Sequence, residues 1–132
     1  MPAVATTAAL YALLDTSDAA HETTAAALDE SGLPLVAMTP VLNDCLRLAR
    51  RFLGHEVALR LLEAAVTGDF LWQPVTKADL QEAAVLLTAE KNLSPSAAIS
   101  IAAAQRLGVT AMLCLEERAR DVAAKQGLLV RP

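Results

Sequence analysis

The chain has 132 residues, of which 55% are hydrophobic and only 3% aromatic, and its formal net charge is −4. A chain of this length can bury a hydrophobic core unaided, so we expect a single domain over residues 1–132. The negative charge disfavours broad binding to nucleic-acid phosphates, which relies on clustered Lys and Arg, although it is compatible with a local basic groove.

Turn residues divide the sequence into short apolar runs that alternate with helical stretches. Five runs have the length of strands, namely residues 3–6, 35–38, 70–73, 110–113 and 128–130. Between them, apolar residues recur at helical spacing, which predicts helices over residues 7–15, 18–31, 39–53, 55–67, 76–90, 94–107 and 116–126. This alternation predicts an α/β fold, with three α/β/α layers built on a short-stranded parallel sheet.

Capping residues support several of these boundaries. Asp18 is the predicted N-cap of the second helix, and Gly32 ends that helix. Thr39 precedes Pro40, a pair that predicts a cap followed by a proline at the first helical position. Thr76 is the predicted cap of the fifth helix.

The sequence predicts a cytoplasmic protein. Its apolar stretches are too short to span a membrane, and its N-terminal residues lack the Lys or Arg of a signal peptide. Cys45 and Cys114 lie far apart and form no C-x-x-C pair, so they predict buried thiols in a reducing compartment instead of a zinc or redox site. The excess of apolar residues in so small a chain predicts an oligomer.

Several short motifs resemble the PIN domain, the fold of VapC-type toxin ribonucleases. They are residues 6–15, Thr39-Pro40-Val41, Arg106-Leu107-Gly108 and Leu115-Glu116-Glu117-Arg118. In order and spacing they cover nearly the whole chain, from residue 4 to about residue 130. The resemblance implies a PIN-like parallel fold, endoribonuclease activity with Mg²⁺ or Mn²⁺, a homodimer and an antitoxin as partner.

The resemblance also implies four acidic positions near the ends of the strands, and two of them hold neutral residues here. In the family, the first strand ends in Asp-Thr-Ser or Asp-Thr-Ala and the Asp binds the metal, whereas this chain has Thr6. Ala97 stands at a second acidic position, where an apolar helix begins. Neither side chain supplies the charge that a hard cation demands of its ligands. In purely structural terms, Thr6 ends a strand, Thr7 caps a helix and Ala97 packs in the core.

Asp44 and Glu116 hold the other two positions, and Glu117 is a third candidate metal ligand. Asp44 lies at the edge of the apolar face of its helix, where it either faces a cleft or pairs with Arg47 on the surface. Glu116 either binds metal or, together with Glu117, stabilises the N-terminus of the last helix. Because Mg²⁺ dehydrates reluctantly, two carboxylates are expected to hold it poorly.

Two functions follow from these residues. The first is a degenerate VapC-like PIN protein that has lost metal-dependent ribonuclease activity and is retained as a binding and oligomerising module, for an antitoxin-like protein or for RNA. Its dimer is expected to form through an apolar stripe of Val41, Leu48, Phe52, Val57 and Leu61. The alternative is a weak but genuine Mg²⁺- or Mn²⁺-dependent endoribonuclease, the toxin of a toxin–antitoxin pair, which uses Asp44, Glu116 and Glu117 with hydroxyls from Thr6 or Ser96.

Other polar and aromatic residues suggest less specific roles. His21 and His55 lack metal-binding spacing and are expected at the surface. Trp72 is expected in the core or in an interface. Three arginines of the third helix either contact RNA phosphates or form a solvated helix end, namely Arg47, Arg50 and Arg51.

Overall fold

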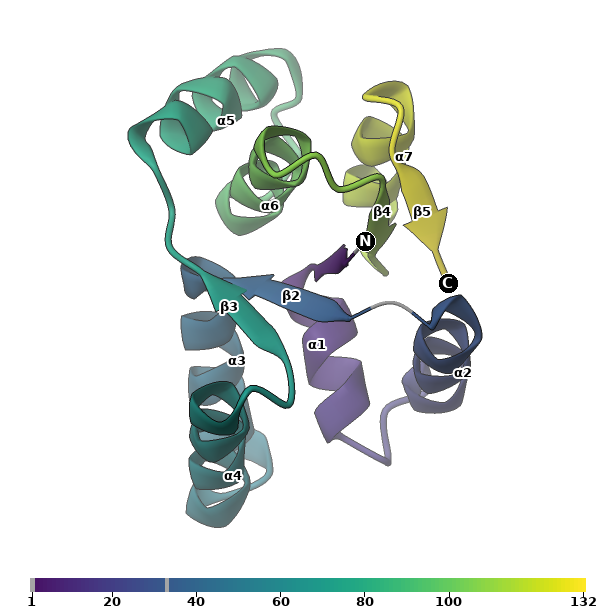
Figure 1. Cartoon of the computed structure of the whole chain (residues 1–132), viewed down its shortest axis with the longest axis vertical. Coiled ribbons are helices and arrows are strands. Elements are labelled where there is room, and N and C mark those ends of the chain that lie inside the picture. The colour runs from purple at the N-terminus through teal and green to yellow at the C-terminus, as the bar shows by residue number, and fades with distance from the viewer. Residues whose placement is uncertain (1, 33) are drawn as a thin grey trace.

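Short parallel strands form one sheet with helices on both faces (Figure 1). This computed structural model describes residues 2–32 and 34–132. The strands are β1 (Ala3–Ala5), β2 (Leu35–Met38), β3 (Leu71–Gln73), β4 (Ala111–Leu113) and β5 (Leu129–Arg131). The helices are α1 (Thr7–Leu14), α2 (His21–Ser31), α3 (Thr39–Phe52), α4 (His55–Thr67), α5 (Lys77–Ala89), α6 (Pro95–Arg106) and α7 (Glu117–Lys125). The predicted α/β architecture is confirmed.

The strand order β3-β2-β1-β4-β5 places the first strand at the centre of the sheet. All four neighbouring pairs are parallel, and Ala5 of β1 pairs with Ala37 of β2 and with Leu113 of β4. The carboxyl ends of the three central strands therefore lie side by side. Residues that are far apart in sequence meet at this edge, where parallel sheets hold their ligands.

Both faces of the sheet are covered by helices, so the core has two halves. Because successive side chains of a strand point to opposite faces, Val4 packs toward α5, α6 and α7 while Ala5 packs toward α1, α3 and α4. Helix α6 is buried on most sides, as its composition predicts. Its buried residues are Ala97, Ala98, Ser100, Ile101, Ala102, Ala103 and Ala104.

Two of the predicted caps are wrong. Helix α2 begins at His21, and Asp18 instead accepts a hydrogen bond from the Ala20 N–H in the turn before it. Thr39 is already helical, and its hydroxyl donates to the Gln73 carbonyl at 3.1 Å, which joins α3 to β3. The predicted Thr76 cap is confirmed, because its side chain accepts a hydrogen bond from the Asp79 N–H.

Trp72 does not lie in the core. It is 49% exposed on β3, which forms one edge of the sheet and has a strand neighbour on one side only. Of the two expectations for this residue, only a place in an interface remains. None of the helices that the structure describes is long and apolar enough to cross a membrane.

A buried ion pair joins α5 to α6. Asp79 is 1% exposed and accepts two hydrogen bonds from Arg106, at 2.7 and 3.0 Å. It also accepts one from the Thr76 N–H at 3.0 Å. Burial raises the pKa of the Asp79 carboxyl, but the hydrogen bonds from Arg106 and Thr76 outweigh it, so this pKa lies below its ordinary value.

We expect Asp79→Asn to lower the free energy of unfolding by about 1.5–3 kcal/mol at neutral pH, the range for losing hydrogen bonds between charged groups, because Arg106 keeps its charge and loses its charged partner. An Asp with a lowered folded-state pKa stabilises the fold above its unfolded pKa of about 3.9 and loses this contribution as the pH falls through the folded value. The difference between variant and parent should therefore shrink below about pH 4. Urea unfolding at several pH values measures this difference in the free energy of unfolding. The matched control is Glu82→Gln on the exposed side of α5, for which we expect little change.

Candidate functional site

The candidate site lies at the carboxyl ends of β1 and β4, where Thr6 and Glu116 meet. The Thr6 hydroxyl, fully buried, donates to Glu116 Oε1 at 2.5 Å. The Leu115 N–H donates to the same oxygen at 3.2 Å, and the Ala8 N–H donates to Oε2 at 3.3 Å. Protein donors therefore contact both carboxylate oxygens of Glu116.

Glu116 acts as a cap for α1 from a distant part of the chain. Thr6 occupies the N-cap position of α1 with extended backbone, but its own side chain caps no backbone N–H. The first N–H groups of a helix have no partner within it, and the Ala8 N–H finds one in Glu116. The expectation that Thr7 caps this helix is wrong, since Thr7 is its first residue and its buried hydroxyl has no partner.

Two buried cysteines lie close to this carboxylate. The Cys114 thiol is 3.9 Å from Glu116 Oε1, and the Cys45 thiol donates to the Thr7 carbonyl at 3.4 Å. Burial raises the pKa of each thiol to about 12. The negative charges of Asp44 and Glu116 add to the shift at Cys45, and the charge of Glu116 adds to the shift at Cys114. The sequence predicted both cysteines as buried thiols, which is confirmed, but it did not connect Cys45 with Glu116. The place of Cys45 on the buried face of α3, four residues after Val41, is the signal that could have identified it.

Asp44 forms the surface pair that was one of its two expected roles. Its carboxylate accepts a hydrogen bond from Arg47 at 3.0 Å, and 30% of its side chain is exposed. None of the hydrogen bonds and ion pairs found in residues 2–32 and 34–132 joins Asp44 to Glu116. The two acids that the sequence retained are therefore not in direct contact.

None of the hydrogen bonds found in residues 2–32 and 34–132 joins the remaining predicted residues to the side chains of Thr6 and Glu116. Ala97 is buried in the core, and its N–H donates to the Ser94 side chain at the start of α6. Ser96 is half-buried on the same helix, and Glu117 is exposed in the first turn of α7. The Ser100 hydroxyl is fully buried and has no partner in the described structure.

The donor set does not fit a hard divalent cation. Among the described residues, no three His, Cys, Asp or Glu side chains lie close enough together to hold a metal ion. Among the described residues, the side chains hydrogen-bonded to Glu116 are the Thr6 hydroxyl and the Cys114 thiol, and a thiol with a pKa of about 12 is protonated at neutral pH. Mg²⁺ and Mn²⁺ favour oxygen ligands over thiols, and Glu116 is the one carboxylate in these contacts.

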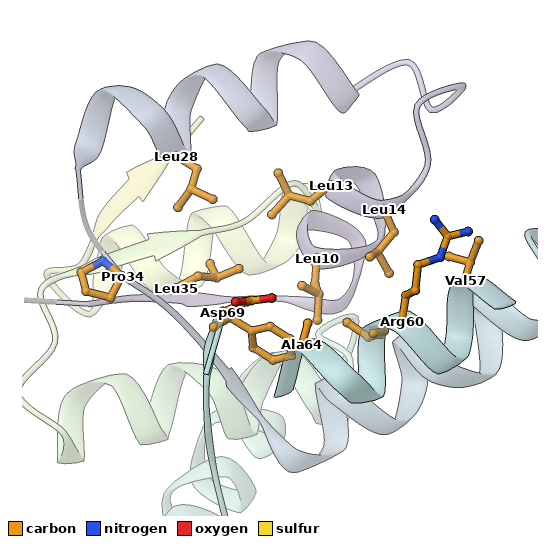
Figure 2. A pocket seen from close by; sticks show the side chains of 12 residues that line it. Leu10, Leu13, Leu14, Leu28, Pro34, Leu35, Val57, Arg60, Ala64 and Asp69 are labelled. Atoms are coloured by element: carbon orange, nitrogen blue, oxygen red, sulfur yellow. The ribbon is translucent and has the colours of Figure 1, made fainter. Parts of the chain in front are cut away.

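A separate apolar pocket of about 510 Å³ lies between α1, α2 and α4 (Figure 2). Leu10, Leu13 and Leu14 of α1 face Leu28 and Leu35 across it. Two charged residues, Arg60 and Asp69, also line the pocket, and neither forms an ion pair within the described chain. Sequence reasoning missed this pocket because its walls come from segments that only the tertiary structure brings together.

The Thr6–Glu116 hydrogen bond gives a prediction for stability. Thr6→Val keeps the side-chain shape but removes the hydroxyl donor, and a hydrogen bond to a charged group contributes about 1.5–3 kcal/mol. We expect a loss in the free energy of unfolding within this range, measured by urea denaturation. Thr88→Val removes an exposed hydroxyl that donates within α5 and serves as control. An equal loss in both variants would contradict a special role for the buried contact.

The two thiols give a prediction for reactivity. The thiolate is the reactive form, and a pKa of about 12 leaves it roughly a thousandfold rarer at pH 8 than for a thiol of pKa 9. We expect neither Cys45 nor Cys114 to react with an aromatic disulfide reagent in the folded protein, and both to react in guanidinium. Thr67→Cys, at an exposed position of α4, should add one fast-reacting thiol. Rapid reaction of two thiols in the folded parent would contradict the predicted protection.

Comparisons with known proteins identify the fold. Neither the models of protein families nor the curated proteins gave a match to this chain. Among solved structures, the chain is similar to VapC20 of Mycobacterium tuberculosis, a toxin that cleaves the sarcin-ricin loop. The TM-score is 0.81 at 23% sequence identity, over 98% of each chain. The chain therefore has the PIN-like α/β/α fold of a VapC toxin.

Proposed function

We propose that this chain is a cytoplasmic, VapC-like PIN protein that has lost metal-dependent ribonuclease activity and works as a binding and dimer-forming module. One observation carries the proposal: the buried Thr6 hydroxyl donates to Glu116 at the strand ends. There the family resemblance implies a carboxylate in place of Thr6. The similarity to VapC20 supports the PIN-like fold. The comparison of Thr6 with the acidic position of the family assumes this fold.

The proposal follows from the number of carboxylates near Thr6 and Glu116. A catalytic cation in a nuclease activates water and neutralises the charge that develops on the phosphate. The family resemblance implies four acids around such a cation, whereas Glu116 is bound here by one hydroxyl and two N–H groups. With Asp44 paired to Arg47, the chain would hold a cation weakly and cleave RNA slowly or not at all.

Binding of a partner protein is supported by the apolar pocket between α1, α2 and α4. Pockets of about 300–1,000 Å³ with apolar walls and a few polar groups are typical binding sites. Leu10, Leu61 and Phe70 form buried parts of its wall, and Arg60 offers a charge with no ion-pair partner in the described residues. We propose that an antitoxin-like segment with apolar side chains occupies this pocket. Besides an antitoxin-like protein, we propose RNA as a second ligand, which the chain would bind without cleaving it.

The alternative is a weak Mg²⁺- or Mn²⁺-dependent endoribonuclease that uses Asp44, Glu116 and Glu117. It is favoured by the partial exposure of Glu116 and the exposure of the adjacent Glu117, which leave both carboxylates within reach of a cation. In this alternative the cation replaces the hydrogen bond from Thr6. The two functions differ in metal affinity, which can be measured without any RNA substrate.

We expect no heat of Mn²⁺ binding at millimolar concentration and no change of melting temperature with Mn²⁺ for the parent chain. Thr6→Asp should behave differently, because two carboxylates in place of the 2.5 Å hydrogen bond repel each other without a cation. This variant should melt below the parent in chelator and be stabilised by Mn²⁺. Calorimetry and thermal unfolding measure both effects, and Thr67→Asp on α4 is the control for an added surface charge.

RNA cleavage decides between the two functions. An assay with Mg²⁺ or Mn²⁺, beside an active metal-dependent ribonuclease as positive control, should show no cleavage by the parent chain. Cleavage that depends on the metal and disappears in Asp44→Asn would refute the proposed loss of activity. Heat of Mn²⁺ binding that vanishes when Asp44 and Glu116 are both neutralised would support the alternative.

A further inference from the structure

Another pocket, of about 410 Å³, lies between helix α2 and strand β5. One wall consists of residues that recur at helical spacing and so share a face of α2, namely Thr23, Ala26, Ala27 and Glu30. The other wall consists of residues 129–132, which are β5 and the proline that follows it. In Figure 1 the carboxyl end of β5 lies beside α2. Among the described residues, none lines both this pocket and the one between α1, α2 and α4.

Strand β5 forms an edge of the sheet, and its central residue has free backbone groups. Within the described chain, β4 is its one strand neighbour. The Leu129 N–H donates to the Thr110 carbonyl at 2.7 Å. The Arg131 carbonyl accepts a hydrogen bond from the Cys114 N–H, also at 2.7 Å. Because backbone groups alternate in direction along a strand, the N–H and carbonyl of Val130 point away from β4, where a further strand can pair with them.

The residues on either side limit how far such a strand can pair. The Leu128 N–H already donates to the Ala123 carbonyl at 3.0 Å, and Pro132 has no N–H to donate. A proline at the end of an edge strand also hinders uncontrolled pairing between sheets. A bound strand therefore pairs with β5 at Val130, and its side chains must supply the rest of the affinity.

Arg131 gives this pocket a donor without an acceptor. Its Nε atom is buried and makes no hydrogen bond in the described structure. None of the ion pairs found in residues 2–32 and 34–132 includes Arg131 or Glu30. A buried donor without an acceptor is unfavourable, and a carboxylate is an acceptor whose geometry matches a guanidinium. The exposed Glu30 on the opposite wall disfavours a small anion with several charges, such as phosphate. The pocket therefore suits a single acidic side chain.

The side chains of β5 define what a neighbouring strand would carry. Val130 packs against the core on one face of the sheet, so Leu129 and Arg131 point to the other face. Leu129 is 55% exposed, and the small side chains of Ala26 and Ala27 leave space across the pocket. Side chains directly opposite each other on paired strands interact. A strand beside β5 thus sets one residue next to Leu129 and another, two positions away, next to Arg131.

We infer that this pocket binds an extended segment of a partner protein, which adds a strand at β5 and carries an acidic residue two positions from an apolar one. The acid pairs with Arg131, the apolar residue contacts Leu129, and backbone hydrogen bonds form at Val130. A second copy of the chain fits less well, because antiparallel pairing of β5 with β5 about Val130 sets Leu129 opposite Arg131 and supplies no carboxylate there. The inference depends neither on the loss of nuclease activity nor on the pocket between α1, α2 and α4.

The backbone amide of Val130 gives a direct readout by nuclear magnetic resonance. The probe is a pool of capped heptapeptides with Asp at the fourth position, Val or Leu at the second and sixth, and Thr elsewhere. We expect the pool to shift the Val130 amide resonance of the full chain and to slow its exchange with deuterium, because a free edge N–H becomes hydrogen-bonded. A pool with Asn in place of Asp should bind about tenfold more weakly.

Three outcomes of this measurement would overturn the inference. The first is a Val130 amide that does not respond to the Asp pool at millimolar concentration. The second is an equal response to sodium acetate alone, which would show an anion site without an added strand. The third is a change of the Val130 amide when the chain is diluted without peptide, which would assign this edge to a second copy.

Arg131→Gln tests the partner of the acidic residue. This variant should bind the Asp pool about tenfold more weakly than the parent and should no longer distinguish it from the Asn pool, as expected when two groups interact directly. Arg50→Gln, at an exposed position of α3, is the matched control and should bind both pools like the parent. A variant at Arg131 that still prefers the Asp pool, or an equal loss in both variants, would contradict the pairing.

Should Arg131→Gln fail to fold, Ala26→Leu tests the same pocket from the opposite wall. Ala26 is exposed and Leu is a good helix former, so this change costs little in folding and fills the space for the bound strand. Ala84→Leu adds the same side chain at an exposed position of α5 and serves as control. Weaker peptide binding in Ala26→Leu alone supports the inference, and parent-like binding overturns it.

Discussion

The hydrogen bond between Thr6 and Glu116 joins residues that are 110 positions apart in the chain. It exists because β1 and β4 are parallel neighbours in a register that aligns their carboxyl ends. Around it, the Glu116 carboxylate accepts an N–H from the first turn of α1, and the Cys114 and Cys45 thiols lie nearby. The start of the first helix thus depends on a side chain that precedes the last helix.

This interaction also bears on the proposed function. The Glu116 carboxylate accepts hydrogen bonds on both of its oxygens, and no second carboxylate takes part in these contacts. The same network satisfies buried polar groups that would otherwise destabilise the fold. We therefore interpret the contacts around Thr6 and Glu116 as structural. The binding roles that we propose involve other parts of the molecular surface.

The pocket between α1, α2 and α4 is the surface that the proposed partner would use. It is lined by apolar side chains together with Arg60 and Asp69, which form no ion pair within the part of the chain that the structure describes. This combination suits a partner segment with apolar side chains and complementary charges.

The sequence by itself determined the order and length of most elements, because helical spacing, Gly and Pro signals and short apolar runs are local. It also placed Glu116 in the segment that follows β4 and Ala97 in a buried helix, as the structure confirms. Only the tertiary structure decided that Asp44 pairs with Arg47 at the surface while Cys45 is buried. Neighbouring residues of a helix point in directions that differ by about 100°, so one can be exposed while the next is buried. Likewise, the Thr6–Glu116 contact and the exposure of Trp72 depend on which strands pair and which form the edges. Strand order is a non-local property, so no short stretch of sequence contains it.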